Sequence, residues 1–185
     1  MTDQRNADAG EACGSRMEER HTKMVGKKQL SRQTTIGAPS DFVYRLFMDN
    51  AELHNWAPPV DRVVKEVGGD ETGLGRTRTC DVTMQGKRGT MVEECVEAVA
   101  DTRASFHVVE DSFGFRRMFR DYGFTVHFAE ITTGTQVRIE TFYTPANFVW
   151  ATMNTLFMRR KFREIADELL EGLRTLAEQR YAAAA

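Results

Sequence analysis

The chain has 185 residues, of which 41% are apolar, and a formal net charge of −2 at pH 7. This length suits one domain with a sizeable core and a spare segment. The near-neutral charge gives no global basic field of the kind that indicates nucleic acid or an anionic membrane as partner.

Cysteine use and hydropathy indicate a cytoplasmic protein. Cys13, Cys80 and Cys95 form an odd set without CxxC spacing, which favours reduced thiols over a disulfide framework. No run approaches the roughly 18 apolar residues of a membrane span, and the N-terminus shows no apolar signal segment. We therefore expect a soluble intracellular protein without membrane insertion.

The first part of the chain separates into a tail and the start of a domain. Residues 1–26 carry only scattered apolar side chains, so we expect a disordered tail ahead of a single domain at 27–181. A first strand is predicted at 27–36. A helix starting at Ser40 or Asp41 follows, and a second short helix over 50–56 ends before two prolines.

Six further runs have the residue pattern of strands and are separated by turn signals. They lie at 60–67, 75–84, 89–99, 103–110, 121–131 and 135–143. The turns "QGKR" and "TTGT" indicate tight hairpins. A long helix over about 146–180 completes the chain.

This order predicts an α+β fold in which a seven-stranded antiparallel sheet curls around the long C-terminal helix. After Met158 the helix has a narrow apolar stripe of Phe162, Ile165, Leu169, Leu173 and Leu176. Residues 148–158 are apolar around most of the helix circumference. We expect this part to lie over the wider end of the curl and to line a ligand cavity and its mouth.

Several stretches resemble the START-like, or SRPBCC, superfamily, in its polyketide cyclase/dehydrase-like branch. They are "TTIGAPSDFVYRLFMDNAELHNWAPPVDRVVKEVGG", "GLGRTRTCDV", "VEECVEAVADTRASFHV" and "ELLEGLRTLAEQR". The resemblance covers residues 31–178. It implies a helix-grip fold, in which a curved sheet wraps the long helix and encloses a hydrophobic cavity. The superfamily includes lipid carriers, hormone receptors, aromatase/cyclases and chaperone cofactors, so the fold does not fix the activity.

The common cofactor and nucleophile motifs are absent from the sequence. The four histidines lack HxxxH and HExxH spacing, the glycines form neither GxGxxG nor a Walker motif, and no GxSxG occurs. We therefore expect no metal and no cofactor.

The fourth strand carries the candidate acid/base. Val92, Glu94 and Val96 share one face, whereas Glu93 and Cys95 share the other. We expect the valine face to point inward, partly because this register matches the aromatase/cyclase resemblance. Glu94 would then exchange protons with a ligand. The alternative is a solvent-facing Glu94.

Two further polar residues are candidate partners of Glu94. Tyr143 ends its strand and has a hydroxyl for a ligand carbonyl, or else it only closes the core. Arg78 has one strand phase that would bring it to Glu94 and another that would leave it in solvent.

Apolar and aromatic residues make up the expected ligand-binding set. Those of the irregular stretch 111–124 form either a lid or a partner-binding patch. The whole set is Trp56, Val92, Val96, Phe113, Phe115, Phe119, Phe124, Val126, Phe128, Ile139, Phe148, Trp150, Met153 and Phe157.

These observations lead to three hypotheses. In the first, the protein binds a hydrophobic, aromatic or polyketide-like molecule and cyclises or dehydrates it without a cofactor. In the second, it is a non-catalytic carrier or sensor of lipids or other apolar metabolites. In the third, the aromatic segments bind another protein. The expected partner is a small molecule rather than nucleic acid, and the protein is expected to be a monomer or homodimer.

Overall fold

One antiparallel sheet of seven strands forms the body of the molecule, with the spatial order β1-β7-β6-β5-β4-β3-β2. The computed structural model describes residues 26–184, so the expected tail, apart from Gly26, lies outside the described residues. The strands are β1 (Lys28–Ile36), β2 (Val60–Val67), β3 (Thr77–Met84), β4 (Lys87–Val99), β5 (Arg103–Asp111), β6 (Phe119–Ile131) and β7 (Gly134–Pro145).

Helices occupy three places in this order. The helices α1 (Ser40–Met48) and α2 (Leu53–Trp56) follow β1, and α3 (Phe115–Met118) precedes β6. The C-terminal rod consists of α4 (Phe148–Met153), the π-helical turn η1 (Asn154–Met158) and α5 (Arg159–Ala184). No helix within residues 26–184 is long and apolar enough to cross a membrane.

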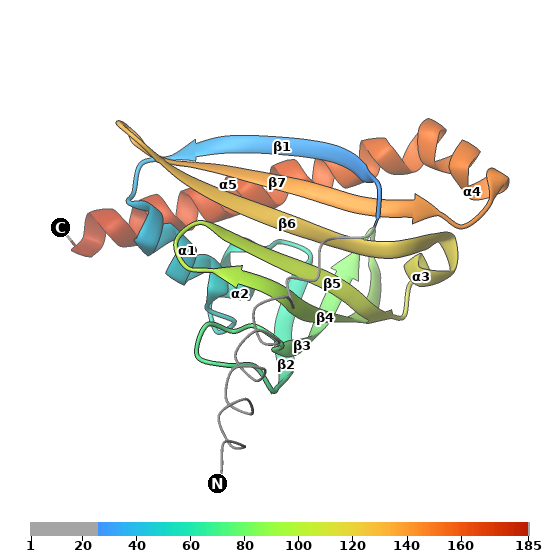
Figure 1. Cartoon of the computed structure of the whole chain (residues 1–185), viewed down its shortest axis with the longest axis horizontal. Coiled ribbons are helices and arrows are strands. Elements are labelled where there is room, and N and C mark those ends of the chain that lie inside the picture. The colour runs from blue at the N-terminus through green and yellow to red at the C-terminus, as the bar shows by residue number, and fades with distance from the viewer. Residues whose placement is uncertain (1–25, 185) are drawn as a thin grey trace, which may run out of the picture.

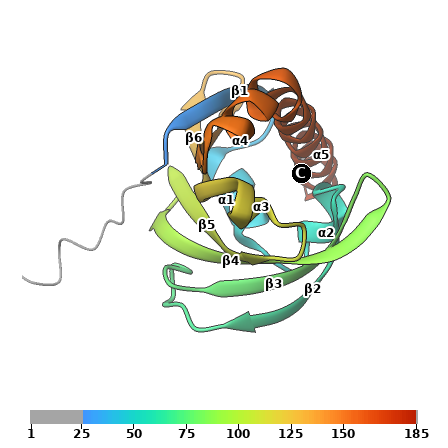
Figure 2. The same cartoon turned by 90° about the vertical axis from the view of Figure 1, so that its right-hand side faces the viewer.

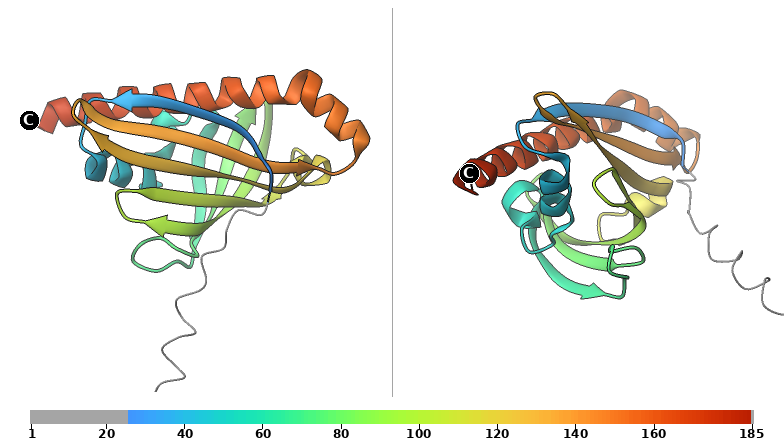
Figure 3. Two further views of the ribbon diagram at one scale, coloured as in Figure 1. Left: turned by 45° about the horizontal axis from the view of Figure 1, so that its top comes forward. Right: turned by 60° about the vertical axis from the view of Figure 1, so that its left-hand side comes forward.

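The sheet curls strongly, and α5 covers its concave side (Figures 1 and 2). The helices α1 and α2 lie beside one end of α5, whereas α3 and α4 lie at the other end of the molecule (Figure 1). The predicted α+β helix-grip fold is therefore confirmed. One difference concerns the rod, which was expected as a single helix. Figure 3 shows that it changes direction between α5 and α4, where η1 interrupts the α-helical hydrogen bonding.

Local sequence accounts for the strands and the first hairpin. In β3 the side chains alternate between buried and half-buried positions, and Arg78, Cys80 and Val82 face inward. Gln85 and Gly86 join β3 to β4 with φ values of 52° and 76°. Two successive positive φ values are what a two-residue hairpin turn requires.

The buried stripe of α5 differs slightly from the predicted one. Its buried residues are Phe162, Ala166, Leu170, Leu173 and Ala177. The predicted Ile165, Leu169 and Leu176 lie at its border and are half-buried.

The closest approach is at Gly172. A Cβ atom placed on this glycine would lie 2.0 Å from the carbonyl oxygen of Trp56, which no real contact allows. Gly172 therefore lets α5 pack directly against the backbone at the end of α2.

We expect Gly172→Ala to lower the free energy of unfolding by about 1–3 kcal/mol, because the helix must move away from Trp56. In an exposed helix the same change would stabilise the protein by roughly 1 kcal/mol. Urea unfolding distinguishes the two outcomes. Thr175→Ala, on the exposed side of the same helix, is the matched control and should be neutral or slightly stabilising.

Candidate functional site

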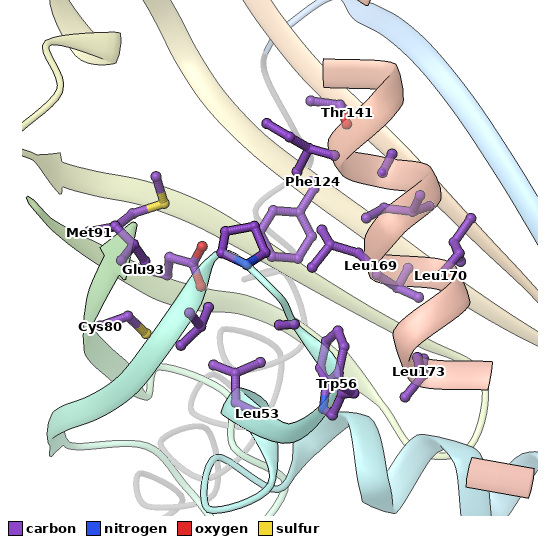
Figure 4. Close-up of a pocket in the computed structure, with 18 of the residues that line it drawn as sticks. Leu53, Trp56, Cys80, Met91, Glu93, Phe124, Thr141, Leu169, Leu170 and Leu173 are labelled. Carbon is purple, nitrogen blue, oxygen red and sulfur yellow. The ribbon is translucent and has the colours of Figure 1, made fainter. Parts of the chain in front are cut away.

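A chamber of about 120 Å³ lies between α5 and the concave face of the sheet. Figure 4 shows that its wall comes from α2, the strands and α5. Most lining side chains are apolar, among them Trp56 of α2, Phe124 of β6, and Leu169 and Leu173 of α5. A protein cavity of roughly 150 Å³ with such a lining can take up benzene. In this conformation the chamber therefore suits a ligand of about one aromatic ring.

One ion pair gives the chamber a charged side. The Nε and Nη2 atoms of Arg78 on β3 lie 2.8 and 2.7 Å from Oε2 of Glu93 on β4. Both residues line the chamber, and their side chains are only 5% and 11% exposed. Nη1 of Arg78 also donates to Asn50 Oδ1 at 2.9 Å, and the Asn50 amide donates to Glu66 Oε2 at 2.7 Å. The guanidinium thus has partners on both sides.

The pair leaves one carboxylate oxygen free. Both Arg78 contacts go to Oε2, and within residues 26–184 no hydrogen bond reaches Glu93 Oε1. The guanidinium of Arg78 also packs on the Phe106 ring, with Cζ 4.5 Å from the ring centre. Oε1 can therefore accept a hydrogen bond from a molecule in the chamber.

Neutral polar groups share the same chamber. Burial, with the charge of Glu93 as the next cause, raises the pKa of Tyr122 far above its usual value, so its hydroxyl is a proton-bearing donor. Burial likewise raises the pKa of the Cys80 thiol to about 12, so this residue is neutral. Thr141 adds a second hydroxyl. The chamber thus combines one free carboxylate oxygen with neutral hydroxyl donors.

The inward face of β4 is the opposite of the predicted one. Met91 and Glu93 line the chamber, whereas Glu94, Val92 and Val96 do not. The reason is cross-strand pairing. Arg78, Cys80 and Val82 form the buried face of β3. Glu93 stands directly opposite Arg78 in the antiparallel pair, so it lies on the same face of the sheet and is buried as well. Glu94 stands opposite Thr77 on the other side.

Tyr143 has the second of its two expected roles, which is to close the core, and not that of a ligand partner. It is completely buried, and its hydroxyl donates to Asn154 Oδ1 at 2.7 Å. It packs with Phe119 and Phe162 in a second core cluster beside the rod. Tyr143 and Phe119 thus anchor the rod and do not line the chamber. Phe128 is likewise in the main core, where its ring meets those of Tyr44 and Phe47.

The apolar start of the rod faces solvent and not the chamber. Phe148 is 84% exposed and Phe157 is 57% exposed, and Met153 is exposed as well. Trp150 is half-buried in the same segment. The expectation that these four residues line the chamber is wrong, because α4 lies at the end of the sheet and not over its concave face (Figures 1 and 3).

The aromatic stretch around α3 borders a second hollow. Phe113 and Phe115 line an outer groove that runs between the β3–β4 hairpin and the first turns of α5. Its walls include Met84 and Phe162, which also line the chamber, so the two spaces adjoin. The groove is much larger than the chamber, at about 480 Å³.

Comparison with known families identifies the domain. Residues 27–178 match the family described as polyketide cyclase / dehydrase and lipid transport. The chain belongs to this family. No curated protein matches the sequence significantly.

Solved structures share the fold. The protein TTHA0849 of Thermus thermophilus is 25% identical, with a TM-score of 0.63 over 84% of this chain and 98% of that one. The ZhuI aromatase/cyclase of Streptomyces sp. R1128 is 12% identical, with a TM-score of 0.65 over 82% and 93%. A START superfamily protein of Mycobacterium smegmatis is 14% identical, with a TM-score of 0.61 over 84% and 98%. At 12% and 14% identity, the last two show the fold alone.

Within this polyketide cyclase / dehydrase and lipid transport domain, the expected ligand set divides. Trp56, Phe124, Val126 and Ile139 of this set line the chamber, and so does Arg78, which was expected as a polar partner of Glu94. Sequence reasoning missed Glu93, and it gave Tyr122 and Thr141 no polar role. Cys95 was an available signal for the phase of β4, because cysteine is among the most often buried residues and shares its face with Glu93.

We expect Arg78→Met to lower the free energy of unfolding by about 3–5 kcal/mol, because it leaves Glu93 buried without its partner. Replacing both residues by methionine should restore most of that loss, since no unpaired charge remains. Chemical unfolding at neutral pH measures all three proteins. The control is Glu94→Gln, which lies outside the chamber and should change stability by less than about 0.5 kcal/mol. A double variant as unstable as Arg78→Met would contradict the pairing argument.

Proposed function

We propose that the protein binds a small apolar molecule, aromatic and bearing a hydroxyl or other hydrogen-bond donor, inside the chamber. The observation that carries this proposal is the free Oε1 of Glu93 in an otherwise apolar chamber. An apolar ring would pack against Trp56, Phe124 and Leu169, and its donor would reach Oε1. The donor is required because an apolar ligand would leave the carboxylate oxygen without a partner.

Ligand size follows from the geometry of the two adjoining spaces. Drug-sized ligands occupy pockets of roughly 300–1,000 Å³, which exceeds the chamber alone. Met84 and Phe162 separate the chamber from the outer groove, and changes in their side-chain conformation would join the two. A one-ring ligand therefore fits directly, and a longer chain would extend into the groove.

The binding proposal is tested with two molecules of similar shape, p-cresol and p-xylene. We expect p-cresol to bind at least about tenfold more tightly, because a hydrogen bond to a charged group contributes roughly 1.5–3 kcal/mol. Isothermal titration measures both affinities. Glu93→Gln should reduce the preference for p-cresol, and Glu94→Gln is the matched control that should keep it.

Filling the chamber provides the second arm of this test. Leu169→Trp and Met91→Trp introduce bulk from opposite walls, and either should abolish the binding of both molecules. Thermal unfolding checks that the variants remain folded. Equal affinity for the two molecules in the native protein, or undiminished binding in a folded, filled variant, would contradict the proposal.

We also propose that the chamber can catalyse cyclisation and dehydration of a poly-β-ketone, as the description of the family and the name of the ZhuI aromatase/cyclase suggest. The supporting observation is that a carboxylate and a neutral phenol line the same chamber. Glu93 would take a proton from the carbon between two carbonyl groups. That carbon would then bond to another carbonyl carbon of the same molecule, whose oxygen receives a proton from Tyr122.

Two proton transfers complete the sequence. The proton on Glu93 passes to the Tyr122 phenolate, which restores both groups. In the dehydration, Glu93 takes a second carbon-bound proton and delivers it to the departing hydroxyl group, which leaves as water. The chemistry thus uses only groups that the chamber contains.

For a short linear poly-β-ketone, we expect Glu93→Gln to lower kcat by about 100-fold or more with little change in KM. Product absorbance follows the reaction, and Glu94→Gln should retain full activity. A Glu93→Gln protein that binds and converts the substrate at the native rate would rule out this role. Binding of p-cresol with no turnover of any such substrate would support the carrier alternative.

A further inference from the structure

Large apolar side chains gather on the surface at the end of the molecule that carries α4. Phe148 is 84% exposed, Leu156 is 62% exposed and Phe157 is 57% exposed. We call this surface the apolar end; it consists of Phe148, Val149, Met153, Leu156 and Phe157. Contiguous exposed apolar groups of this kind mark a surface that contacts another molecule or a membrane.

The apolar end is held in place by specific contacts. Asn147 caps α4, since its Oδ1 atom accepts the backbone N–H of Trp150 at 3.1 Å. The buried Asn154 of η1 accepts the Tyr143 hydroxyl at 2.7 Å. These contacts fix the bend in the rod that points α4 away from the sheet (Figure 3). The exposed phenylalanines therefore lie on an ordered support.

Basic side chains lie on the segments next to the apolar end. Those that lie on α3, at the start of β6 and in the first turns of α5 are all exposed: Arg116, Arg117, Arg120, Arg159, Arg160, Lys161 and Arg163. The two groups meet because Arg120 donates to the carbonyl oxygen of Ala146 at 3.0 Å, just before α4. Figures 1 and 2 show α3 and α4 at the same end of the molecule.

The local charge differs from that of the whole chain. Residues 111–124 and 147–164 contain seven Lys or Arg and three Asp or Glu, although the chain has a net charge of −2. Of the acids, Glu164 already pairs with Arg160 and Lys161. Within residues 26–184, Arg116, Arg117 and Arg163 form no ion pair.

We propose that this end docks on the surface of an anionic lipid bilayer. The apolar side chains would enter the headgroup region, and the surrounding arginines would meet lipid phosphates. A second copy of the chain fits less well, because a twofold contact would place each cluster of cations against its own copy. Docking would turn the outer groove, lined by Phe115 and Met158, toward the membrane. The proposal concerns a surface outside the chamber and goes beyond the proposed function.

Vesicle co-sedimentation with the full chain tests the docking. We expect binding to phosphatidylcholine vesicles that contain about one third phosphatidylglycerol, and at least roughly tenfold weaker binding to phosphatidylcholine alone. Phe148→Ser should lower the partition coefficient about tenfold, because one large apolar side chain is lost from the interface. Arg116→Gln and Arg117→Gln should each lower it about fivefold, and added salt should weaken binding.

Matched controls come from the opposite side of the sheet. Val67 is 53% exposed and Lys65 is exposed, both on the edge strand β2, so Val67→Ser and Lys65→Gln should bind vesicles like the native protein. Phe148→Ser should also leave the melting temperature and p-cresol binding unchanged, which separates this test from that of the chamber.

Three outcomes would overturn the proposal. They are no binding to the anionic vesicles, equal binding to neutral and anionic vesicles, and binding that Phe148→Ser leaves unchanged. Light scattering provides a further check. A native dimer that Phe148→Ser converts to a monomer would assign the apolar end to self-association instead.

Discussion

The contact of α5 with the concave face of the sheet determines where the chamber lies. A seven-stranded sheet that curls has an apolar inner face, and α5 is the one element within residues 26–184 long enough to cover it. Near α2 the helix approaches to backbone contact, because Gly172 has no side chain to keep it from Trp56. Closer to its start, Phe162 and Leu169 border empty space instead. The chamber is thus a consequence of uneven packing along a single helix.

The buried pair of Arg78 and Glu93 is the least expected feature of that space. Two charges in an apolar interior lose much of their hydration, and a well-packed apolar pair in their place is often at least as stable. The pair therefore contributes little net stability, and its role in the proposed function is to offer one carboxylate oxygen to a ligand. Asn50 and the Phe106 ring hold the guanidinium, which in turn orients Glu93 with one oxygen toward the chamber.

The C-terminal rod contributes both to the chamber and to the apolar end. Its α5 segment forms one wall of the chamber, whereas α4 and η1 present apolar side chains to solvent at the end of the sheet. The π-helical turn separates the two roles, since it redirects the rod and is fixed by Asn154 and Tyr143. The outer groove lies between the chamber and the apolar end, and it shares Met84 and Phe162 with the chamber wall. An apolar molecule could thus move from a docked membrane to the chamber along one side of the rod.

Local patterns in the sequence determined the order of the strands and helices. The alternation of β3, the Gln85-Gly86 turn and the helical spacing of α5 each depend on neighbouring residues, so they could be predicted. The inward face of β4 was harder to predict, because apart from Cys95 the sequence of the strand leaves its two faces nearly equivalent. Arg78 on the adjacent strand decided that Glu93, and not Glu94, is buried. The start of the rod, residues 148–158, is apolar around most of its circumference, so its sequence did not show which side would be buried. An apolar side chain is buried only where another layer covers it, and in the folded protein the sheet ends before α4.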